Sequence, residues 1–173
     1  MKSKRYRYVA ATLAAALTSV AAVGVAAGSA ERTAATDKNI VQVATEAGQF
    51  NTLTRLAKRA GLVGALSGST KLTVFAPTDK AFAKVPRSTV RSLERNRSQL
   101  RAVLLYHAVK GDVKAAQVVK LRRAKTLNGA SVRIGVKGNR VYLNRTVRVV
   151  KTDIEASNGT IHVIDGVLIP PAS

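Results

Sequence analysis

The sequence predicts an α+β domain in which helices come first and an antiparallel sheet follows. Between residues 40 and 108 the apolar residues recur at three- and four-residue steps, the spacing of helices that bury one face. After Gly111 apolar and polar residues alternate, and Asn-Gly and Gly-Asn pairs separate the alternating segments. Such pairs mark tight hairpin turns. Helices and strands segregated along the chain in this way are typical of the α+β class.

Helices are expected to fill most of residues 40–108. Gly61 and Gly68 each follow the last apolar position of a helical segment, where glycine commonly ends a helix, and Pro86 ends another segment. The predicted helices cover residues 40–61 with a break near Gly48, 62–68, 78–85, 88–95 and 98–108.

One strand interrupts this helical half at residues 71–76, where the apolar run KLTVFA stops at Pro77. Thr78 then occupies the N-cap position of a short helix, because its hydroxyl can accept a hydrogen bond from an unpaired N–H of the first turn. Asp79 lies in that first turn, where the helix dipole favours a negative charge. The segment therefore predicts a buried strand followed directly by a capped helix.

A hairpin in the second half can be predicted down to its register. A two-residue loop at Gly138-Asn139 places Val136 opposite Val141. The same register places Ile134 opposite Leu143, so both apolar pairs fall on one face of the sheet.

The remaining strands are delimited by turn residues. Asn128-Gly129 marks a further hairpin turn, and another strand begins at Val147. We expect that strand to end at Asp153, which would start the turn toward Asn158-Gly159. The last strand then covers residues 160–164.

Residues 1–30 have the layout of a secretory signal peptide. Four basic residues precede an uncharged, alanine-rich stretch that ends in small residues, with cleavage expected after Ala27 or Ala30. A retained membrane anchor is the alternative, and the weak hydrophobicity of alanine favours cleavage. We therefore expect a secreted protein, extracellular or associated with the cell surface, with a short leader at residues 31–38 and a single domain at residues 39–171.

The composition leaves little material for catalysis. The chain of 173 residues has the size of one domain and contains no cysteine, so it has no disulfide, no thiolate nucleophile and no cysteine-based metal site. Only two histidines and nine carboxylates are present, and neither a Gly-x-Gly-x-x-Gly nor a Gly-x-Ser-x-Gly motif occurs. We expect a protein that is not an enzyme and that uses no cofactor and no metal.

Basic residues are concentrated in one part of the chain. The formal net charge is +20, and residues 84–125 carry 12 basic side chains against Glu94 and Asp112. Arginines spaced four apart line one face of a helix, and clustered guanidinium groups gain affinity for charged polymers by releasing counterions. A solvated basic face without a partner is the alternative. The hypothetical polyanion-binding face consists of Arg87, Arg91, Arg95, Arg97, Arg101, Arg122 and Arg123.

Three segments together resemble the fasciclin (FAS1) domain family, in a bacterial secreted single-domain form. Residues 73–82 (TVFAPTDKAF) are similar to its first signature block, residues 104–107 (LLYH) to its central Tyr-His motif, and residues 157–170 (SNGTIHVIDGVLIP) to its closing block. The resemblance implies a β-sandwich wedge flanked by N-terminal and central helices, and a non-catalytic role in adhesion. The family positions expected to be mainly structural are Thr78, Asp79, Tyr106, His107, Asn158, Gly159, His162 and Asp165.

The two histidines and one acidic residue are the remaining candidates for a specific role. We expect His107 to be buried and hydrogen-bonded to Thr78 or Asp79, the alternative being a contact surface formed by Tyr106-His107. We expect His162 to lie at the surface or the rim of the fold, since it alternates with two apolar neighbours. Asp153 with Ile154 resembles a dipeptide proposed for integrin contact in animal relatives, and a turn role is favoured.

The expected partner is an anionic polymer of the cell envelope or matrix, or another surface protein, and peripheral contact with anionic lipid fits the same charge. Nucleic acid is disfavoured, because export separates the chain from the genome and five aromatic residues after residue 30 are too few for a stacking platform. The alternative function is a secreted small-ligand carrier or enzyme with a pocket near Tyr106-His107. The sequence determines neither the oligomeric state nor whether adhesion is homotypic.

Overall fold

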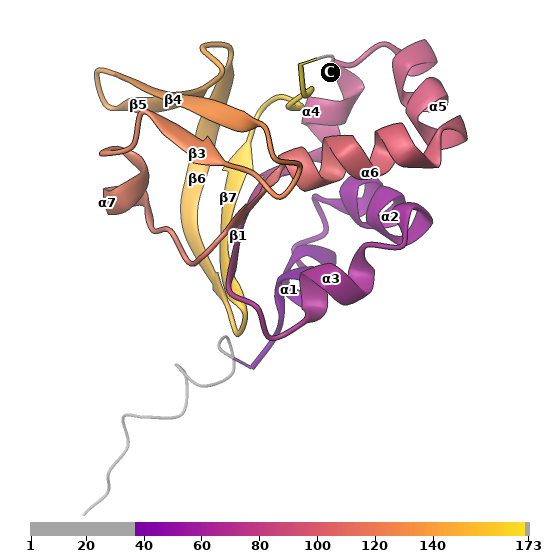
Figure 1. Ribbon diagram of the computed structural model, residues 1–173, viewed down its shortest axis with the longest axis horizontal. Helices are drawn as coiled ribbons and strands as arrows, with labels where there is room; N and C mark the ends of the chain where they lie inside the picture. The colour runs from indigo at the N-terminus through magenta and orange to yellow at the C-terminus, as the bar shows by residue number, and fades with distance from the viewer. Residues whose placement is uncertain (1–36, 172–173) are drawn as a thin grey trace, which may run out of the picture.

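The computed structural model describes residues 37–171, in which helices pack against one strongly curled sheet (Figure 1). The first half contains α1 (Ile40–Glu46), α2 (Asn51–Ala60), α3 (Val63–Ser67), β1 (Leu72–Pro77), α4 (Asp79–Ala83), α5 (Arg87–Arg95) and α6 (Arg97–Tyr106). The second half contains β2 (Ala108–Lys110), α7 (Ala115–Val118), β3 (Arg123–Lys125), β4 (Ser131–Lys137), β5 (Arg140–Leu143), β6 (Val147–Ala156) and β7 (Gly159–Ile164). The predicted signal peptide lies outside the described residues.

The α+β class is confirmed, and the seven strands form a nearly closed sheet. Their order is β2-β1-β7-β6-β5-β4-β3, and a bridge between Val109 and Thr126 brings the two edges together. Most neighbouring strands are antiparallel, as predicted, but β1 pairs with β7 in parallel, from Leu72 opposite Gly159 to Pro77 opposite Ile164. The strand of the helical half is thus a central member of the sheet, and the sheet is mixed.

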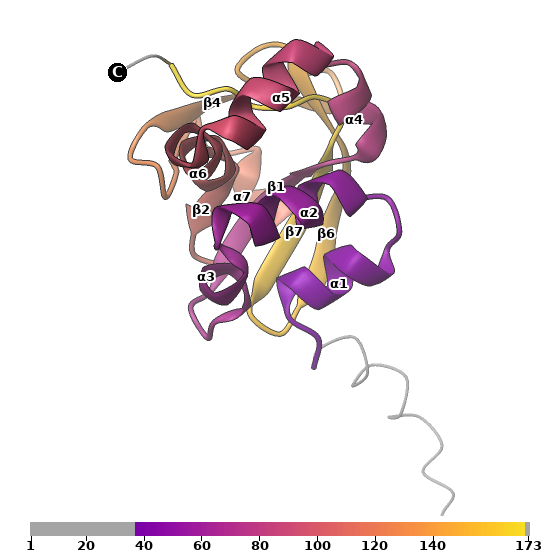
Figure 2. The ribbon, with the colours of Figure 1, turned by 90° about the vertical axis from the view of Figure 1, so that its right-hand side faces the viewer.

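Two apolar cores lie on the two faces of β1 and β7. Helices α1 to α6, gathered on one side of the sheet in Figure 2, enclose one core around Phe50, Leu56 and Leu100. The curled sheet encloses the other around Phe75 and Leu143. Every residue of β1 and β7 is buried, because both of their faces are covered, and such strands carry continuous apolar runs.

Local sequence signals located most elements. The helix break after α1 and the glycine that ends α2 lie where they were predicted, and Gly61 adopts a left-handed conformation with φ +68°. The β4–β5 register is also confirmed, with Val136 opposite Val141 and Ile134 opposite Leu143. Ile134 and Leu143 are buried, whereas Val136 is 51% exposed because this end of the hairpin extends beyond the core.

Two predictions of secondary structure were wrong, and one helix was missed. The helix predicted at residues 98–108 ends at Tyr106, because Ala108 begins β2 and pairs with β1. The short helix α7 was not predicted. β6 does not end at Asp153, which instead has φ +56° at an irregularity in the pairing of β6 with β7, and the strand continues to Ala156.

Among residues 37–171, no helix is both long and apolar enough to cross a membrane.

Candidate functional site

Tyr106 and His107 are adjacent in the chain, but their side chains contact different parts of the fold. The His107 ring is 1% exposed, and its Nδ1 lies 2.8 Å from the Val103 carbonyl oxygen. Its Nε2 accepts a hydrogen bond of 2.9 Å from the Leu168 N–H. Burial is therefore confirmed, but the predicted partners Thr78 and Asp79 are wrong.

The hydrogen bonds of His107 specify its neutral form. A carbonyl at Nδ1 requires a proton there, and an N–H at Nε2 requires a lone pair. Burial lowers the pKa of His107 from 6.5 to about 4, although the bond to Val103 acts in the opposite direction. The imidazole is thus a buried, uncharged link between α6 and the segment after β7.

The Tyr106 hydroxyl connects α6 to β4 and to the turn between β5 and β6. It donates a hydrogen bond of 3.2 Å to the Ser131 carbonyl oxygen and accepts one of 3.1 Å from Asn144 Nδ2. Tyr106 also lines an open groove of about 630 Å³ to which His107 does not contribute. The structure therefore places only one member of the Tyr-His pair at a surface groove.

His162 is buried, which corrects the prediction of a surface position. Its ring is 1% exposed and stacks on Phe75 with 5.6 Å between the ring centroids. Nε2 lies 2.8 Å from the Val113 carbonyl oxygen, and Nδ1 accepts from the Asp153 N–H at 3.3 Å. Burial is the main cause that lowers the pKa of His162. The prediction failed because β7 is a central strand covered on both faces.

Thr78 and Asp79 each stabilise the start of a helix. The Thr78 hydroxyl accepts from the Ala81 N–H at 3.2 Å and caps α4, as predicted. The Asp79 carboxylate accepts from the Thr52 N–H at 2.7 Å and from Asn51, so it also caps α2, whose own N-cap residue provides no side-chain bond. Burial raises the pKa of Asp79, but the bonds from Thr52 and Asn51 outweigh it and lower the pKa.

The closing block acts as a structural junction. Buried Asn158 donates from Nδ2 to the carbonyls of Leu66 and Gly68, both at 2.8 Å, and its Oδ1 accepts from the Ile40 N–H at 2.8 Å. Asp165 accepts from the Arg148 N–H at 2.9 Å. These residues connect α1, α3 and the strands, which agrees with the structural role expected for them.

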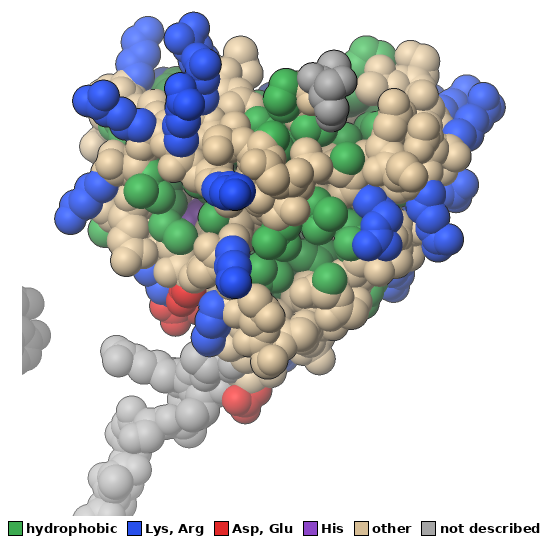
Figure 3. Space-filling view, viewed as in Figure 1, with side chains coloured by type: hydrophobic (Ala, Val, Ile, Leu, Met, Phe, Trp, Pro, Cys, Tyr) green, Lys and Arg blue, Asp and Glu red, His purple; other side chains and the backbone are tan. Residues whose placement is uncertain are grey.

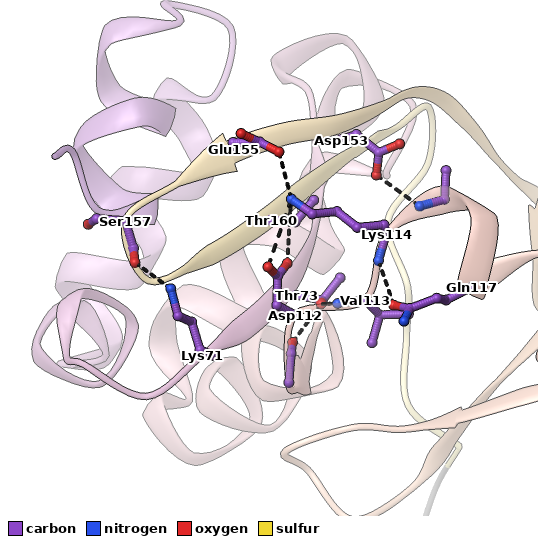
Figure 4. Close-up of polar contacts among 12 residues, drawn as sticks. Lys71, Thr73, Asp112, Val113, Lys114, Gln117, Asp153, Glu155, Ser157 and Thr160 are labelled. Carbon is purple, nitrogen blue, oxygen red and sulfur yellow. Dashed lines mark hydrogen bonds and ion pairs between the residues drawn. The ribbon is translucent and has the colours of Figure 1, made fainter. Parts of the chain in front are cut away.

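An acidic cluster surrounds Lys114 (Figure 4). Lys114 Nζ lies 3.0 Å from Glu155 and 3.8 Å from Asp112, and the hydrogen bond to Glu155 is the main cause that raises the pKa of Lys114. Asp153 accepts from the Ala115 N–H at 2.8 Å at the start of α7. The cluster therefore fastens the β2–α7 segment to β6 and β7, and Asp153 has a structural partner within the chain.

The arginines of the predicted basic face differ in what they contact. Arg97 Nε donates to the Arg59 carbonyl oxygen at 3.0 Å, and Arg101 Nη1 donates to that of Ala60 at 3.2 Å. Both carbonyls belong to the last residues of α2, where a positive charge stabilises the helix dipole. Arg97 and Arg101 therefore dock α6 onto α2.

Arg87, Arg91 and Arg95 form what we call the α5 row. All three are exposed, α5 has no buried residue, and within residues 37–171 none of the three guanidinium groups has a hydrogen bond or a carboxylate within 4 Å. Arg87 and Arg91 line a cleft with Phe82 on one side of α5. The α5 row is thus a free cationic surface.

The structure does not place Arg122 and Arg123 beside the α5 row. Arg123 begins β3 of the curled sheet and Arg122 directly precedes it, whereas α5 lies among the helices (Figure 1). On the face shown in Figure 3, basic side chains lie over the curled sheet, from its left edge to the middle of the view, and over the helices on the right, with apolar surface between these two groups. The predicted face is therefore divided into two separate regions.

Arg123 lines the Tyr106 groove together with two arginines that the sequence analysis missed, Arg133 and Arg145. Arg133 lies directly opposite Arg123 in the β3–β4 pair, and Arg145 lies in the turn between β5 and β6. The sequence carried no signal for the pairing of Arg123 with Arg133, because a two-residue loop at Asn128-Gly129 would place Arg123 opposite Ile134 instead.

Comparisons with known proteins agree with the fold and the motifs. The Fasciclin domain family matches residues 48–170. Protein sll1483 of Synechocystis sp. is 44% identical over 142 residues, which cover 80% of this chain and 78% of that protein. Immunogenic protein MPB70 of Mycobacterium bovis is 42% identical over 118 residues, covering 68% of this chain and 59% of that protein.

A solved FAS1 domain pair from the insect cell adhesion molecule fasciclin I superposes with a TM-score of 0.63 at 19% identity, covering 77% of this chain and 51% of that one. At this identity the match concerns the fold. Together with the family match over most of the folded region, it shows that the chain belongs to the fasciclin domain family.

Proposed function

We propose that this protein is a secreted, non-catalytic adhesion domain that is retained at the cell surface or matrix by binding an anionic polymer through the α5 row. The observation that carries the proposal is the free state of Arg87, Arg91 and Arg95. Like charges four residues apart destabilise a helix by about 0.2–0.5 kcal/mol per pair. A polyanion laid along α5 would remove this repulsion and release its own counterions.

Family membership and the two histidines support a role by contact. The related fasciclin I is described as a cell adhesion molecule. In this chain both imidazoles are buried, and both nitrogens of each ring contact backbone groups, so neither ring is free to act as a general base on a bound substrate. The alternative is a carrier with a pocket near Tyr106-His107. Of these two residues only Tyr106 lines the open groove.

The nature of the polymer follows from the shape of the site. The α5 row is a line of exposed guanidinium groups spaced four residues apart along a helix, which suits an extended polymer of repeating charge. Phe82, the aromatic residue that lines the cleft with Arg87 and Arg91, is buried at 8% exposure, so a stacking mode for single-stranded nucleic acid is not favoured. Anionic polymers of the envelope or matrix are the partner class that we propose.

The test is binding of the protein to isolated cell envelopes across a salt series. The full chain is expressed in a secreting host and recovered as that host processes it. One variant carries Arg87→Gln, Arg91→Gln and Arg95→Gln, and a matched control loses three exposed lysines elsewhere through Lys110→Gln, Lys120→Gln and Lys137→Gln.

The native protein is expected to lose binding steeply as salt rises, and the α5 variant to bind weakly with a log–log slope that is shallower by roughly two to three. The lysine variant should stay close to the native protein. Equal losses in both variants would show that only net charge matters, and salt-insensitive binding would refute the proposal.

A further inference from the structure

The groove beside Tyr106 has the features of a binding site separate from the α5 row. We call it the arginine groove; it is open, has a volume of about 630 Å³ and is lined by Tyr106, Arg123, Ser131, Arg133, Asn144, Arg145, Ile169 and Pro171. Three of these residues are cationic and none is acidic. Within the described residues, no carboxylate lies within 4 Å of these three guanidinium groups.

Two of the arginines are placed against each other by the sheet. Arg123 of β3 and Arg133 of β4 are direct cross-strand partners. Side chains in this relation lie close together, and like charges directly opposite are unfavourable. An anion between them would turn this repulsion into attraction.

The third arginine is held in a costly backbone conformation. Asn144 and Arg145 have φ of +49° and +71°, in the left-handed region that non-glycine residues seldom adopt. The two residues are the centre of a tight hairpin turn, closed by the Thr146 N–H and the Leu143 carbonyl oxygen at 3.2 Å, in which asparagine and glycine are favoured and arginine is not. Backbone strain of this kind is concentrated at functional sites.

The floor of the groove is rigid and does not use the guanidinium groups. Asn144 Oδ1 accepts from the Arg133 N–H at 3.0 Å, and the Asn144 N–H donates to the Arg133 carbonyl at 2.8 Å. Asn144 Nδ2 donates to the Tyr106 hydroxyl, which donates to Ser131. Backbone groups and the neutral side chains of Asn144 and Tyr106 therefore hold β4, which carries Arg133, and the turn that carries Arg145. The guanidinium groups take no part in these hydrogen bonds and are available to a ligand.

We propose that the arginine groove binds a compact phosphate or sulfate group, either as the free ion or as the monoester end of a larger molecule. Guanidinium groups match tetrahedral oxyanions with paired hydrogen bonds. Ile169, which is 58% exposed, and Pro171 form an apolar wall beside the arginines, where the uncharged part of a monoester can lie. This site does not depend on the α5 row, whose arginines lie on the other side of α5.

That separation is visible in the lining of the neighbouring cleft. Thr89, Ser92 and Leu93 of α5 face residues 169–171 and so lie toward the arginine groove. Arg87 and Arg91 line the cleft with Phe82 instead. The two cationic regions can therefore be removed independently by substitution.

The test is an NMR titration of the ¹⁵N-labelled protein, recovered from a secreting host, with inorganic phosphate, inorganic sulfate, phenyl phosphate and acetate in separate experiments at constant ionic strength. Saturable shifts are expected at Arg123, Arg133, Asn144 and Arg145 with the phosphate and sulfate probes. Tighter binding of phenyl phosphate would identify a monoester as the preferred source, and equal affinity would identify the free ion. Saturation by acetate as tight as by phosphate would overturn the proposed ligand class.

Matched variants distinguish this site from general electrostatics. Arg123→Gln, Arg133→Gln and Arg145→Gln together should weaken binding about tenfold or more, because charge-assisted hydrogen bonds are lost. The variant with Arg87, Arg91 and Arg95 changed to Gln should bind almost as tightly as the native protein. If the triple groove variant does not fold, Arg145→Gly alone is expected to weaken binding. Equal weakening in both triple variants, shifts centred on α5 or the absence of saturation would refute the proposal.

Discussion

Acidification is expected to destabilise this fold through its buried histidines. Protonation of His107 would place a hydrogen on Nε2, where the Leu168 N–H now donates. The ring would also carry a charge in an apolar interior at 1% exposure. Protonation of His107 is therefore unfavourable in the folded state, whereas in the unfolded chain the imidazole is protonated with its ordinary pKa of 6.5.

The size of the effect follows from linkage. With a pKa of 6.5 in the unfolded chain and about 4 in the folded protein, the unfolded state binds more protons between these values, so stability falls as the pH falls. The loss from His107 is about 2 kcal/mol at pH 5 and levels off at about 3 kcal/mol below pH 4. His162 has a lowered pKa for the same reason and adds a loss of the same sign.

The assay is urea unfolding followed by circular dichroism at pH 7, 6 and 5. In this window Asp79 contributes little, because its pKa is lowered from 3.8 and its stabilisation is lost only at more acidic pH. The control is His107→Gln, which should be less stable at pH 7 but should lose clearly less stability between pH 7 and 5. An unchanged slope in this variant, or an imidazole resonance of His107 that titrates near 6.5 in the folded protein, would refute the reasoning.

Three further predictions concern the effect of single substitutions on the stability of the protein. Gly159→Ala should destabilise by about 3 kcal/mol or more in the same urea assay, because φ is +145° and a Cβ would overlap the Leu72 carbonyl group; near-native stability would contradict the β1–β7 pairing. Asn158→Ala should cost about 2–4 kcal/mol, since three partners lose their hydrogen bonds, and a loss below 1 kcal/mol would contradict the junction. Arg145→Gly should raise stability by up to about 1 kcal/mol, because relief of the left-handed conformation outweighs the chain entropy that glycine costs, and a decrease would show that the turn is not strained.

Sequence reasoning located the elements whose signals are local. The β4–β5 register followed from a two-residue turn and an alternating pattern, both contained in ten residues. The pairing of β1 with β7 joins residues almost ninety positions apart. The apolar run of β1 contains no signal that indicates which strand pairs with it. The short strand β2 was missed, and its first residue, Ala108, was predicted to end a helix, because only the pairing with β1 makes this segment a strand.

The same limit explains the errors in the candidate site. His162 alternates with Ile161 and Val163, and this pattern predicts an exposed face unless the strand is central and covered on both sides. The partner of His107 was missed because Leu168 lies 61 residues further along the chain. Arg133 lies in a strand and Arg145 in a turn, each without another arginine at helical spacing. The predicted basic face was based on that spacing and therefore omitted them.

The arginines also show why net charge overstates a binding surface. Arg97 and Arg101 have the same spacing in the sequence as the residues of the α5 row, yet they donate to carbonyl groups at the end of α2 and hold two helices together. What separates a structural arginine from one available to a partner is whether acceptors of the chain already lie opposite its guanidinium group. By this criterion the α5 row and the arginine groove are available, in two regions that one compact ligand cannot reach together. An extended polymer and a compact oxyanion are therefore expected to bind without competing, unless the polymer is long enough to cross α5.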